Sequence, residues 1–321
     1  MQFSRIPEAG APLGGPLVYA FAGERSHYDL RIVDAARKAC CGAKRFADVD
    51  CASFDAAPIL RRACTFAPAT GPTGVYSADA RWATAVVELV DRTSGQTLAA
   101  PERRFLPAAE AAAAPALLTA LPANRLIAAG ESDELTLLTD APLELTLRIE
   151  YGPHVATETH RLPAAGLHLF RLCTADFPQA DRITVDAGPC GTVVYSVTAP
   201  VQGAVRLAWR SRAGSVEHYT FPTEVAAGVE ALRREAYGPD GYVGGASVES
   251  YRKLRSAAEG REVLEALAEL LATPEVWLVE GDRYTPVNAA AERAVVHSHG
   301  ALRWMEITVR PKTKPAEPWN C

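Results

Sequence analysis

Residues 205–222, VRLAWRSRAGSVEHYTFP, decide how the C-terminal part of this chain is interpreted. Two short aliphatic and aromatic runs flank the RAGS sequence at residues 212–215, a pattern that predicts a β-hairpin with a glycine-containing turn. Tyr219 and Phe221 lie two residues apart, so their side chains share one face of a strand. Together with Trp209 they could stack on a sugar or mark a protein interface. Two aromatic side chains on the same strand face suit packing in a hydrophobic core better than a binding surface, and we favour the core interpretation.

Composition narrows the possible partners. The chain has 321 residues, of which 48% are hydrophobic and 22% charged, as in ordinary globular proteins with a buried core. Its formal net charge of −5 argues against a nucleic-acid binder that works through a broad basic surface. No run approaches the ~18 apolar residues of a membrane-spanning helix. We therefore expect neither a nucleic acid nor a membrane as partner.

The seven cysteines are scattered over the chain, and their odd number does not fit a disulfide scaffold. They indicate folding in a reducing compartment, such as a host cytoplasm. Residues 11–24, APLGGPLVYAFAGE, resemble a signal peptide in their apolar middle, but glycine and proline interrupt the run. We interpret this segment as an early β-strand, and export to the cell surface is the alternative.

Short strand-like runs separated by turn residues predict a mainly β fold. Residues 1–107 are assigned to a first β-sandwich of immunoglobulin-like type, in which residues 81–106 form a clear hairpin and residues 55–64 a brief helix. The alanine-rich residues 107–115 are either one helical turn or a linker. A second sandwich is predicted over residues 116–200, where Leu143, Leu145, Leu147 and Ile149 alternate along one strand face.

Residues 201–321 are predicted to form an α+β domain with an antiparallel sheet and one helix. After the opening hairpin, residues 237–247 (YGPDGYVGGAS) look like a loop rich in glycine and tyrosine. Residues 261–275, REVLEALAELLATPE, then carry leucines at helical spacing, and Pro274 ends the helix. Four strand-like runs complete the domain.

Few residues suggest chemistry. His297 and His299 share a strand face and could both reach one metal ion, but no third or fourth ligand is evident near them. Asp48 and Asp50 also share a face, which we interpret as a solvated strand surface. The nucleophile elbow, the zinc-protease motif, the phosphate loop and the dinucleotide fingerprint are all missing from the sequence. We expect a protein that is not an enzyme, with no cofactor, no metal and no small-molecule ligand.

Three segments of the C-terminal third resemble uncharacterised tail-associated structural proteins of Bacteroidales phages and prophages. These segments are RLAWRSRAGSVEHYTF (206–221), LEALAELLATPEVWLVEGDRYTPVNA (264–289) and ALRWMEITVRP (301–311). Two N-terminal segments, FDAAPILRRA and RWATAVVEL, match more loosely. The resemblance implies a virion component that assembles by protein–protein contact, and it implies no catalytic residues.

Such a component should be a rigid β-rich module that folds in the host cytoplasm and assembles through symmetric interfaces with itself and other virion proteins. The hairpin and the loop after it supply the candidate interface residues, which are Trp209, Arg212, His218, Tyr219 and Tyr242. Two other functional classes stay open. One is an exported β-sandwich protein for carbohydrate binding or adhesion, and the other is a metal-dependent enzyme that uses the histidine pair.

Overall fold

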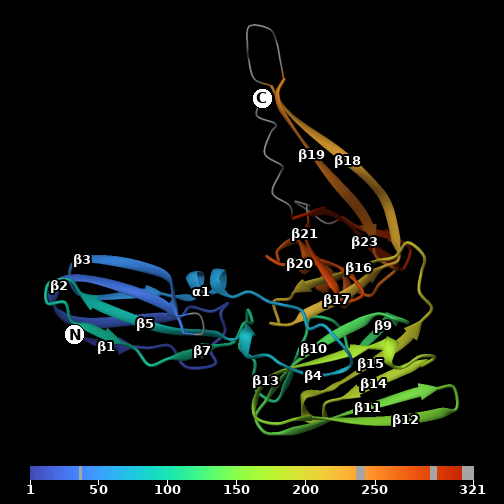
Figure 1. Cartoon of the computed structure of the whole chain (residues 1–321), viewed down its shortest axis with the longest axis horizontal. Helices are drawn as coiled ribbons and strands as arrows, with labels where there is room; N and C mark the ends of the chain where they lie inside the picture. Colours follow the sequence, from blue (N-terminus) through green and yellow to red (C-terminus); the bar gives the residue numbers. More distant parts are fainter. Residues whose placement is uncertain (36–37, 236–242, 290–294, 313–321) are drawn as a thin grey trace.

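The computed structural model describes residues 1–35, 38–235, 243–289 and 295–312, and it confirms a mainly β chain (Figure 1). The strands form four sheets, which are six-, four-, five- and eight-stranded. In Figure 1 the N-terminal sheet lies to the left, the sheets of the middle region lie at the lower right, and the C-terminal sheet lies above them. Among the described residues, no helix combines the length and the apolar composition needed to cross a membrane.

The N-terminal sheet is antiparallel and wraps one core. Its strands are β1 (Gln2–Arg5), β2 (Val18–Asp34), β3 (Ala39–Asp55), β5 (Ala83–Asp91), β6 (Thr97–Ala99) and β7 (Arg103–Phe105). The pairing of β2 with β3 shifts register between Ala22 and Ser26, and such bulges bend a strand. Buried side chains from both ends of β2, including Phe21 and Ile32, therefore belong to the same hydrophobic cluster.

The predicted brief helix is confirmed as α1 (Ala57–Ala63), with Pro58 in its first turn. Asp55 does not occupy the cap position itself, which is Ala56. Its carboxylate nevertheless accepts hydrogen bonds from the backbone N–H groups of Ala57 at 3.0 Å and Leu17 at 2.8 Å. The carboxylate thus ties the start of α1 to the segment that leads into β2.

The middle region is a sandwich of two sheets that enclose one hydrophobic core. One sheet has the order β4 (Gly74–Ser77), β13 (Gly166–Cys173), β10 (Ser132–Thr139) and β8 (Ala116–Leu118). The other has the order β12 (His154–Leu162), β11 (Leu143–Tyr151), β14 (Arg182–Asp186), β15 (Thr192–Thr198) and β9 (Asn124–Ala128). The predicted alternation on β11 is confirmed, since Leu145, Leu147 and Ile149 are all fully buried. Three 3-10 turns complete this part of the chain: η1 (Asp79–Arg81), η2 (Thr174–Asp176) and η3 (Gly188–Cys190).

Two features of the sandwich differ from a simple succession of domains. Strand β4 comes from the segment assigned to the first domain, yet it pairs with β13 at the edge of the sandwich. Strand β9 pairs with β15 in parallel, whereas the other named pairs are antiparallel. The alanine-rich residues 107–115 contain no helix, so of the two alternatives the linker describes them.

The C-terminal sheet is antiparallel and carries the second helix. Its order is β17 (Val216–Phe221), β16 (Val205–Arg210), β20 (Val276–Glu280), β21 (Arg283–Ala289), β23 (Leu302–Pro311), β19 (Val243–Arg255) and β18 (Thr223–Glu235), with β22 (Val295–His299) also paired to β23. Helix α2 (Arg261–Ala268) continues into the 3-10 turn η4 (Glu269–Leu271). Leu264, Leu267 and Leu270 are buried in the core of this sheet, as their spacing predicts.

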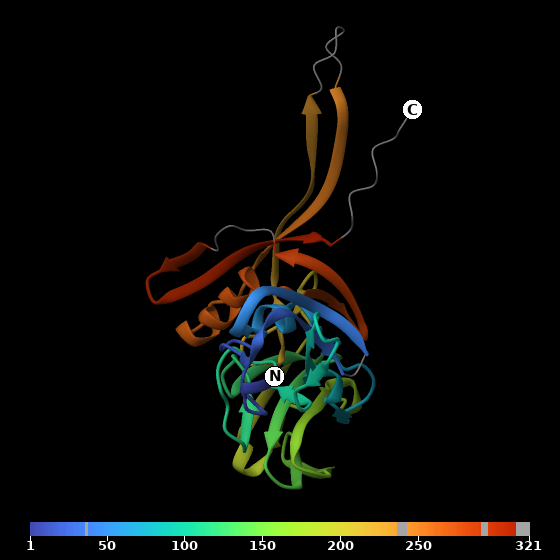
Figure 2. The ribbon, with the colours of Figure 1, turned by 90° about the vertical axis from the view of Figure 1, so that its left-hand side faces the viewer.

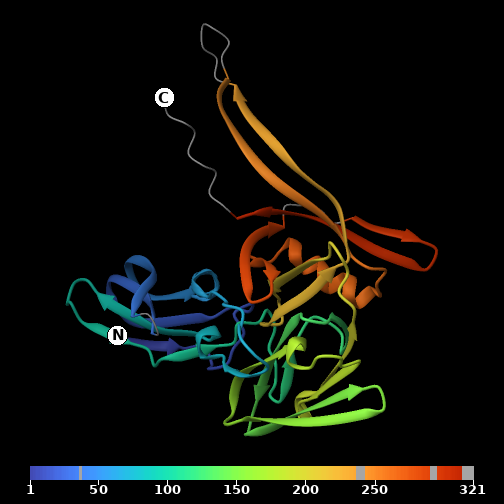
Figure 3. The ribbon, with the colours of Figure 1, turned by 45° about the vertical axis from the view of Figure 1, so that its right-hand side comes forward.

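Strands β18 and β19 form a long two-stranded ribbon that projects from the rest of the molecule (Figures 1, 2 and 3). Each strand has thirteen residues. The predicted loop over residues 237–247 is therefore wrong in its second half, because β19 begins at Val243. Alanine, glycine and charged residues have low β propensity, so these strands give little local signal of their conformation.

Candidate functional site

The hairpin predicted over residues 205–222 is confirmed. Val205 pairs with Phe221 and Arg210 with Val216, and the connection closes through a bond from the Ser211 N–H to the Ser215 carbonyl at 2.9 Å. Gly214 has a φ of +90°, a left-handed conformation that favours glycine. A side chain there would also press against the backbone of the linker at Pro107, so the turn packs closely against the linker.

Most aromatic side chains of the hairpin belong to the core. Trp209 and Phe221 are 0% exposed, and both belong to the hydrophobic cluster beneath α2. Tyr219 is half-buried and donates its hydroxyl to Glu259 at 2.6 Å. Burial raises the pKa of Tyr219, and the neighbouring Glu259 carboxylate raises it further. The core interpretation of the aromatic residues therefore holds for Trp209 and Phe221.

The structure buries some of the five candidate interface residues and exposes others. Trp209 and His218 are buried inside the chain, so neither can contact a neighbouring subunit in this conformation, and this part of the interface prediction needs correction. Arg212 is exposed at the turn, and Tyr219 reaches the surface in part. Tyr242 lies outside the described residues.

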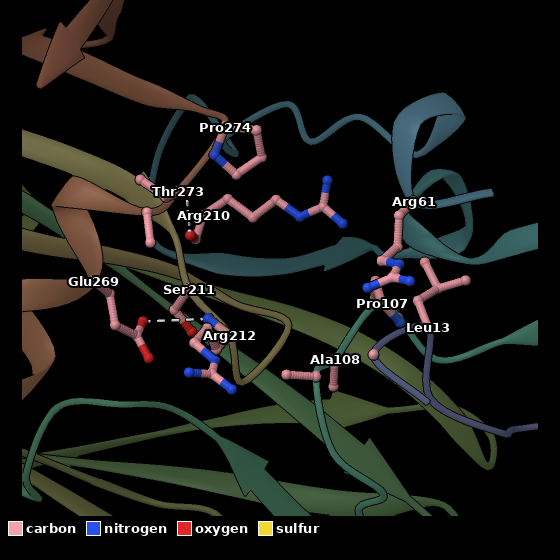
Figure 4. Close-up of a pocket in the computed structure, with 13 residues that line it drawn as sticks. Leu13, Arg61, Pro107, Ala108, Arg210, Ser211, Arg212, Glu269, Thr273 and Pro274 are labelled. Atoms are coloured by element: carbon pink, nitrogen blue, oxygen red, sulfur yellow. Dashed lines mark hydrogen bonds between the residues drawn. The ribbon is translucent and has the colours of Figure 1, made fainter. Parts of the chain in front are cut away.

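A cavity of about 410 Å³ lies where the N-terminal region, the linker and the hairpin meet (Figure 4). Arg61 on α1, Arg210 at the end of β16 and Arg212 in the turn line it, together with Glu269. The Glu269 carboxylate accepts a bond from the Arg212 N–H at 3.2 Å. Burial raises the pKa of Glu269, although that N–H partly opposes the effect.

Several polar groups of this cavity already have structural partners. The Arg210 guanidinium donates to the Cys64 carbonyl at 2.7 Å and stacks on the Phe66 ring at 4.4 Å. The Thr273 hydroxyl donates to the Arg210 carbonyl, and the Ser211 hydroxyl pairs with that of Ser215. Neither hydroxyl is joined to a histidine, so the cavity offers no activated nucleophile among the residues that the structure describes.

A network of buried charges joins the sandwich to the hairpin. Strand β10 is buried on both faces, because the second sheet of the sandwich covers one face and β17 lies near the other. Glu134 on β10 forms a salt bridge with Arg81 at 2.6 Å, and both side chains are almost fully buried. Buried ion pairs of this kind require complete hydrogen bonding to offset their loss of hydration.

Asp133 is the centre of this network. Its carboxylate lies 3.1 Å from the Arg125 guanidinium and 3.0 Å from Nδ1 of His218. Burial alone would raise the pKa of Asp133, but the His218 contact and the positive charges of Arg125 and Arg206 outweigh it and hold this pKa well below its usual value. Sequence spacing could not reveal the cluster, because its members come from separate strands.

The network continues toward the outer strands. Arg206 on β16 donates to Glu131 at 3.0 Å, and Thr220 on β17 donates to the same carboxylate at 2.9 Å. Farther along, Arg171 on β13 contacts Asp282 at 2.5 Å. These pairs connect the sandwich to three strands or turns of the C-terminal sheet, so they hold the two regions in a single arrangement.

The two histidines considered for metal binding lie on β22, as predicted. His297 stacks on Trp304, with ring centroids 5.6 Å apart, and His299 is exposed beside the turn. Within the part of the chain that the structure describes, no three histidine, cysteine, aspartate or glutamate side chains are grouped to hold a metal ion. The six described cysteines are free thiols.

The ribbon presents two different faces. Cross-strand partners share a face, so Val229 with Ser250 and Ala231 with Val248 lie together on one side. All four are exposed, and each of the two valines retains 66% exposure. We call these four residues, together with Ala227, the bare face. Arg252, the cross-strand partner of Ala227, borders this face at the root of the ribbon and is paired with Glu224.

The opposite face makes contacts within the ribbon and with β23. Gly228 pairs with Tyr251, whose ring lies so close that a β-carbon at the glycine would meet it at 2.9 Å. Glu230 and Glu249 form the next pair, and Arg310 of β23 bridges both carboxylates. The ribbon therefore carries bridged charges on one side, and on the other side small aliphatic side chains with Ser250.

Comparisons with known proteins add little. No protein-family model and no curated protein matches the chain. One similar solved structure is Dpr2 Ig1-Ig2 in complex with DIP-Theta Ig1-Ig3, at 11% identity and a TM-score of 0.17, with 62% of this chain and 99% of that chain covered. Another concerns host cell surface retention of a 1.5-MDa bacterial ice-binding adhesin, at 9% identity and a TM-score of 0.16, with 76% and 86% covered. Scores this low carry no argument about function.

Proposed function

We propose that this chain is a non-enzymatic structural protein of a phage or prophage virion, associated with the tail, and that it assembles by protein–protein contact through the β18–β19 ribbon. The virion assignment rests on the resemblance of the C-terminal segments, and the mode of action rests on the ribbon. The protein would fold in the host cytoplasm and need no cofactor.

One observation carries the mode of action. The ribbon has thirteen-residue strands, and β19 pairs with β23 only from Arg252 to Arg255, at its root. A two-stranded ribbon without a core beneath it is marginally stable in water at best. Its exposed valines and unpaired strand edges are the features by which a sheet recruits another chain. A partner that covers the ribbon would complete the structure.

The rest of the molecule suits a scaffold. Three ion pairs hold the sandwich against the C-terminal sheet: Arg125 with Glu217, Arg206 with Glu131 and Arg171 with Asp282. In the cavity of Figure 4, Arg210, Ser211 and Thr273 already have hydrogen-bond partners within the chain. A rigid body with one projecting element can hold neighbouring proteins at fixed positions. This supports an assembly role over a catalytic one.

Composition of purified particles tests this proposal. Particles from a host that carries the gene are purified, and peptides of this chain are measured by quantitative mass spectrometry. We expect a fixed copy number per particle, enriched with the tail fraction. Complementation with Val229→Glu should reduce incorporation, while Val155→Glu, which changes an exposed valine on β12, should not. Recovery of the chain only in the soluble fraction would contradict the proposal.

A further inference from the structure

We infer that the bare face of the ribbon binds the bare face of a second copy of this chain. The inference rests on the proposed function for its biological setting but makes a separate prediction about the isolated protein. The bare face consists of Ala227, Val229, Ala231, Val248 and Ser250, all of them exposed.

The chemistry of this face suits its own copy. Its five residues carry no charge, and Arg252, which lies opposite Ala227 at the root end of the same face, is paired with Glu224. Two identical faces therefore meet without an uncompensated like charge from these residues. Its small aliphatic side chains permit close approach of two ribbons. A contact of one surface with itself has two-fold symmetry, which is the commonest way in which identical chains associate.

Neighbouring charges are arranged to leave this face free. Glu224 is paired with Arg252 near the root, with the carboxylate 2.5 Å from the guanidinium. Glu230 and Glu249 are on the opposite face and are held there by Arg310. A partner that approached the bare face would therefore meet no uncompensated charge among these residues.

Strand β18 also lacks the usual protection of an exposed edge. Lysine and proline, which commonly prevent edge pairing, do not occur between Thr223 and Glu235. Alanine and glycine occupy residues 226–228, next to the root of the ribbon. Other exposed apolar residues, such as Leu126 and Val155, are single residues on different strands. The ribbon instead groups its valines on one surface.

Paired charge variants test the inference directly. The mass of the full-length protein is measured by light scattering over a wide concentration range for the wild type, Val229→Glu and Val229→Lys. We expect a concentration-dependent dimer for the wild type. For each variant we expect a dimer dissociation constant at least ~10-fold higher, because like charges then face each other. An equimolar mixture of the two variants should restore association, since opposite charges meet across a self-contact. Val155→Glu should associate as the wild type does.

Several results would overturn the inference. A wild type that stays monomeric at every concentration would do so, as would association that Val229→Glu leaves unchanged. Failure of the Glu and Lys variants to rescue each other would mean that the ribbon meets some other surface. None of these results would remove the chain from purified particles, so the proposed function fails or stands by its own test. Circular dichroism of each variant checks that it folds.

Discussion

The junction of sandwich and hairpin and the projecting ribbon are both built from antiparallel strands, yet they are completed in opposite ways. At the junction, Asp133 and Glu134 are buried and each has an arginine within 3.1 Å. On the ribbon, Val229 and Val248 are exposed and no described part of the chain covers them. The first region pairs these buried carboxylates with arginines of the same chain, whereas the second leaves apolar surface uncovered.

This difference assigns the stability of the fold to the junction and assembly with other chains to the ribbon. Buried ion pairs contribute little net stability, but loss of one partner leaves an uncompensated charge, so they discriminate strongly against other arrangements. An exposed apolar face does not stabilise the isolated chain. It contributes favourable free energy only when another surface covers it. Substitutions in the two regions should therefore act on different measurable quantities.

The largest effect on folding is expected from Arg125→Ala. The change leaves the buried carboxylates of Asp133 and Glu217 without this partner, which should cost about 3–5 kcal/mol in the free energy of unfolding. Urea denaturation measures it. The matched control is Arg148→Ala, which removes an exposed arginine paired with Glu150 and should cost at most about 1 kcal/mol. Equal losses in both variants would contradict the account of the junction.

Acid should weaken the junction through Asp133. Its pKa is lower in the folded chain than the unfolded value of ~4, so its contribution is present above that value and is lost as the pH falls toward the folded pKa. Asp133→Asn should destabilise the protein by about 1–3 kcal/mol at pH 7. Thermal unfolding between pH 7 and pH 2 should show the gap between wild type and variant narrowing. A gap that is constant or widens would argue against the assignment.

A smaller effect is expected from Arg310→Ala at the root of the ribbon. The change removes the bridge to Glu230 and Glu249, both partly exposed, and should cost at most about 1 kcal/mol. Hydrogen exchange of the amides in residues 228–231 should nevertheless accelerate, because the bridge holds both strands. Unchanged exchange there would show that the bridge does not order the ribbon.

The smallest effect on folding is expected from Val229→Glu. Surface substitutions away from special features usually change stability by no more than ~0.5 kcal/mol, and this side chain is 66% exposed. Urea denaturation of dilute protein should therefore superimpose on the wild type, even though association is weakened. A large loss of stability would mean that the bare face is covered within the monomer.

Local patterns predicted the elements whose signal lies in one segment. The hairpin at residues 205–222, the helix that begins at Arg261 and the buried face of residues 145–149 follow from turn residues and periodicity. A strand of four residues such as Gly74–Ser77 gives no sign of which sheet it joins. Strand β18 gives no clean alternation, because neither of its faces is covered by a core.

The candidate site was harder to predict from the sequence than the fold. His218 was proposed as an interface residue because it stands beside aromatic residues, yet it is buried against Asp133, eighty-five positions earlier in the chain. Such pairing depends on long-range packing that no local pattern encodes. Trp209 illustrates the same limit, because an aromatic residue on a strand suits a core and an interface equally well until its burial is known.

Hydrogen exchange of the ribbon in two states tests the central claim most directly. Amides of residues 225–231 and 248–251 are followed in dilute protein and in purified particles, with the buried strand β10 as an internal control. We predict rapid exchange of the ribbon in dilute protein, strong protection in particles, and protection of β10 in both. Equal exchange of the ribbon in the two states would contradict the claim that another chain completes it.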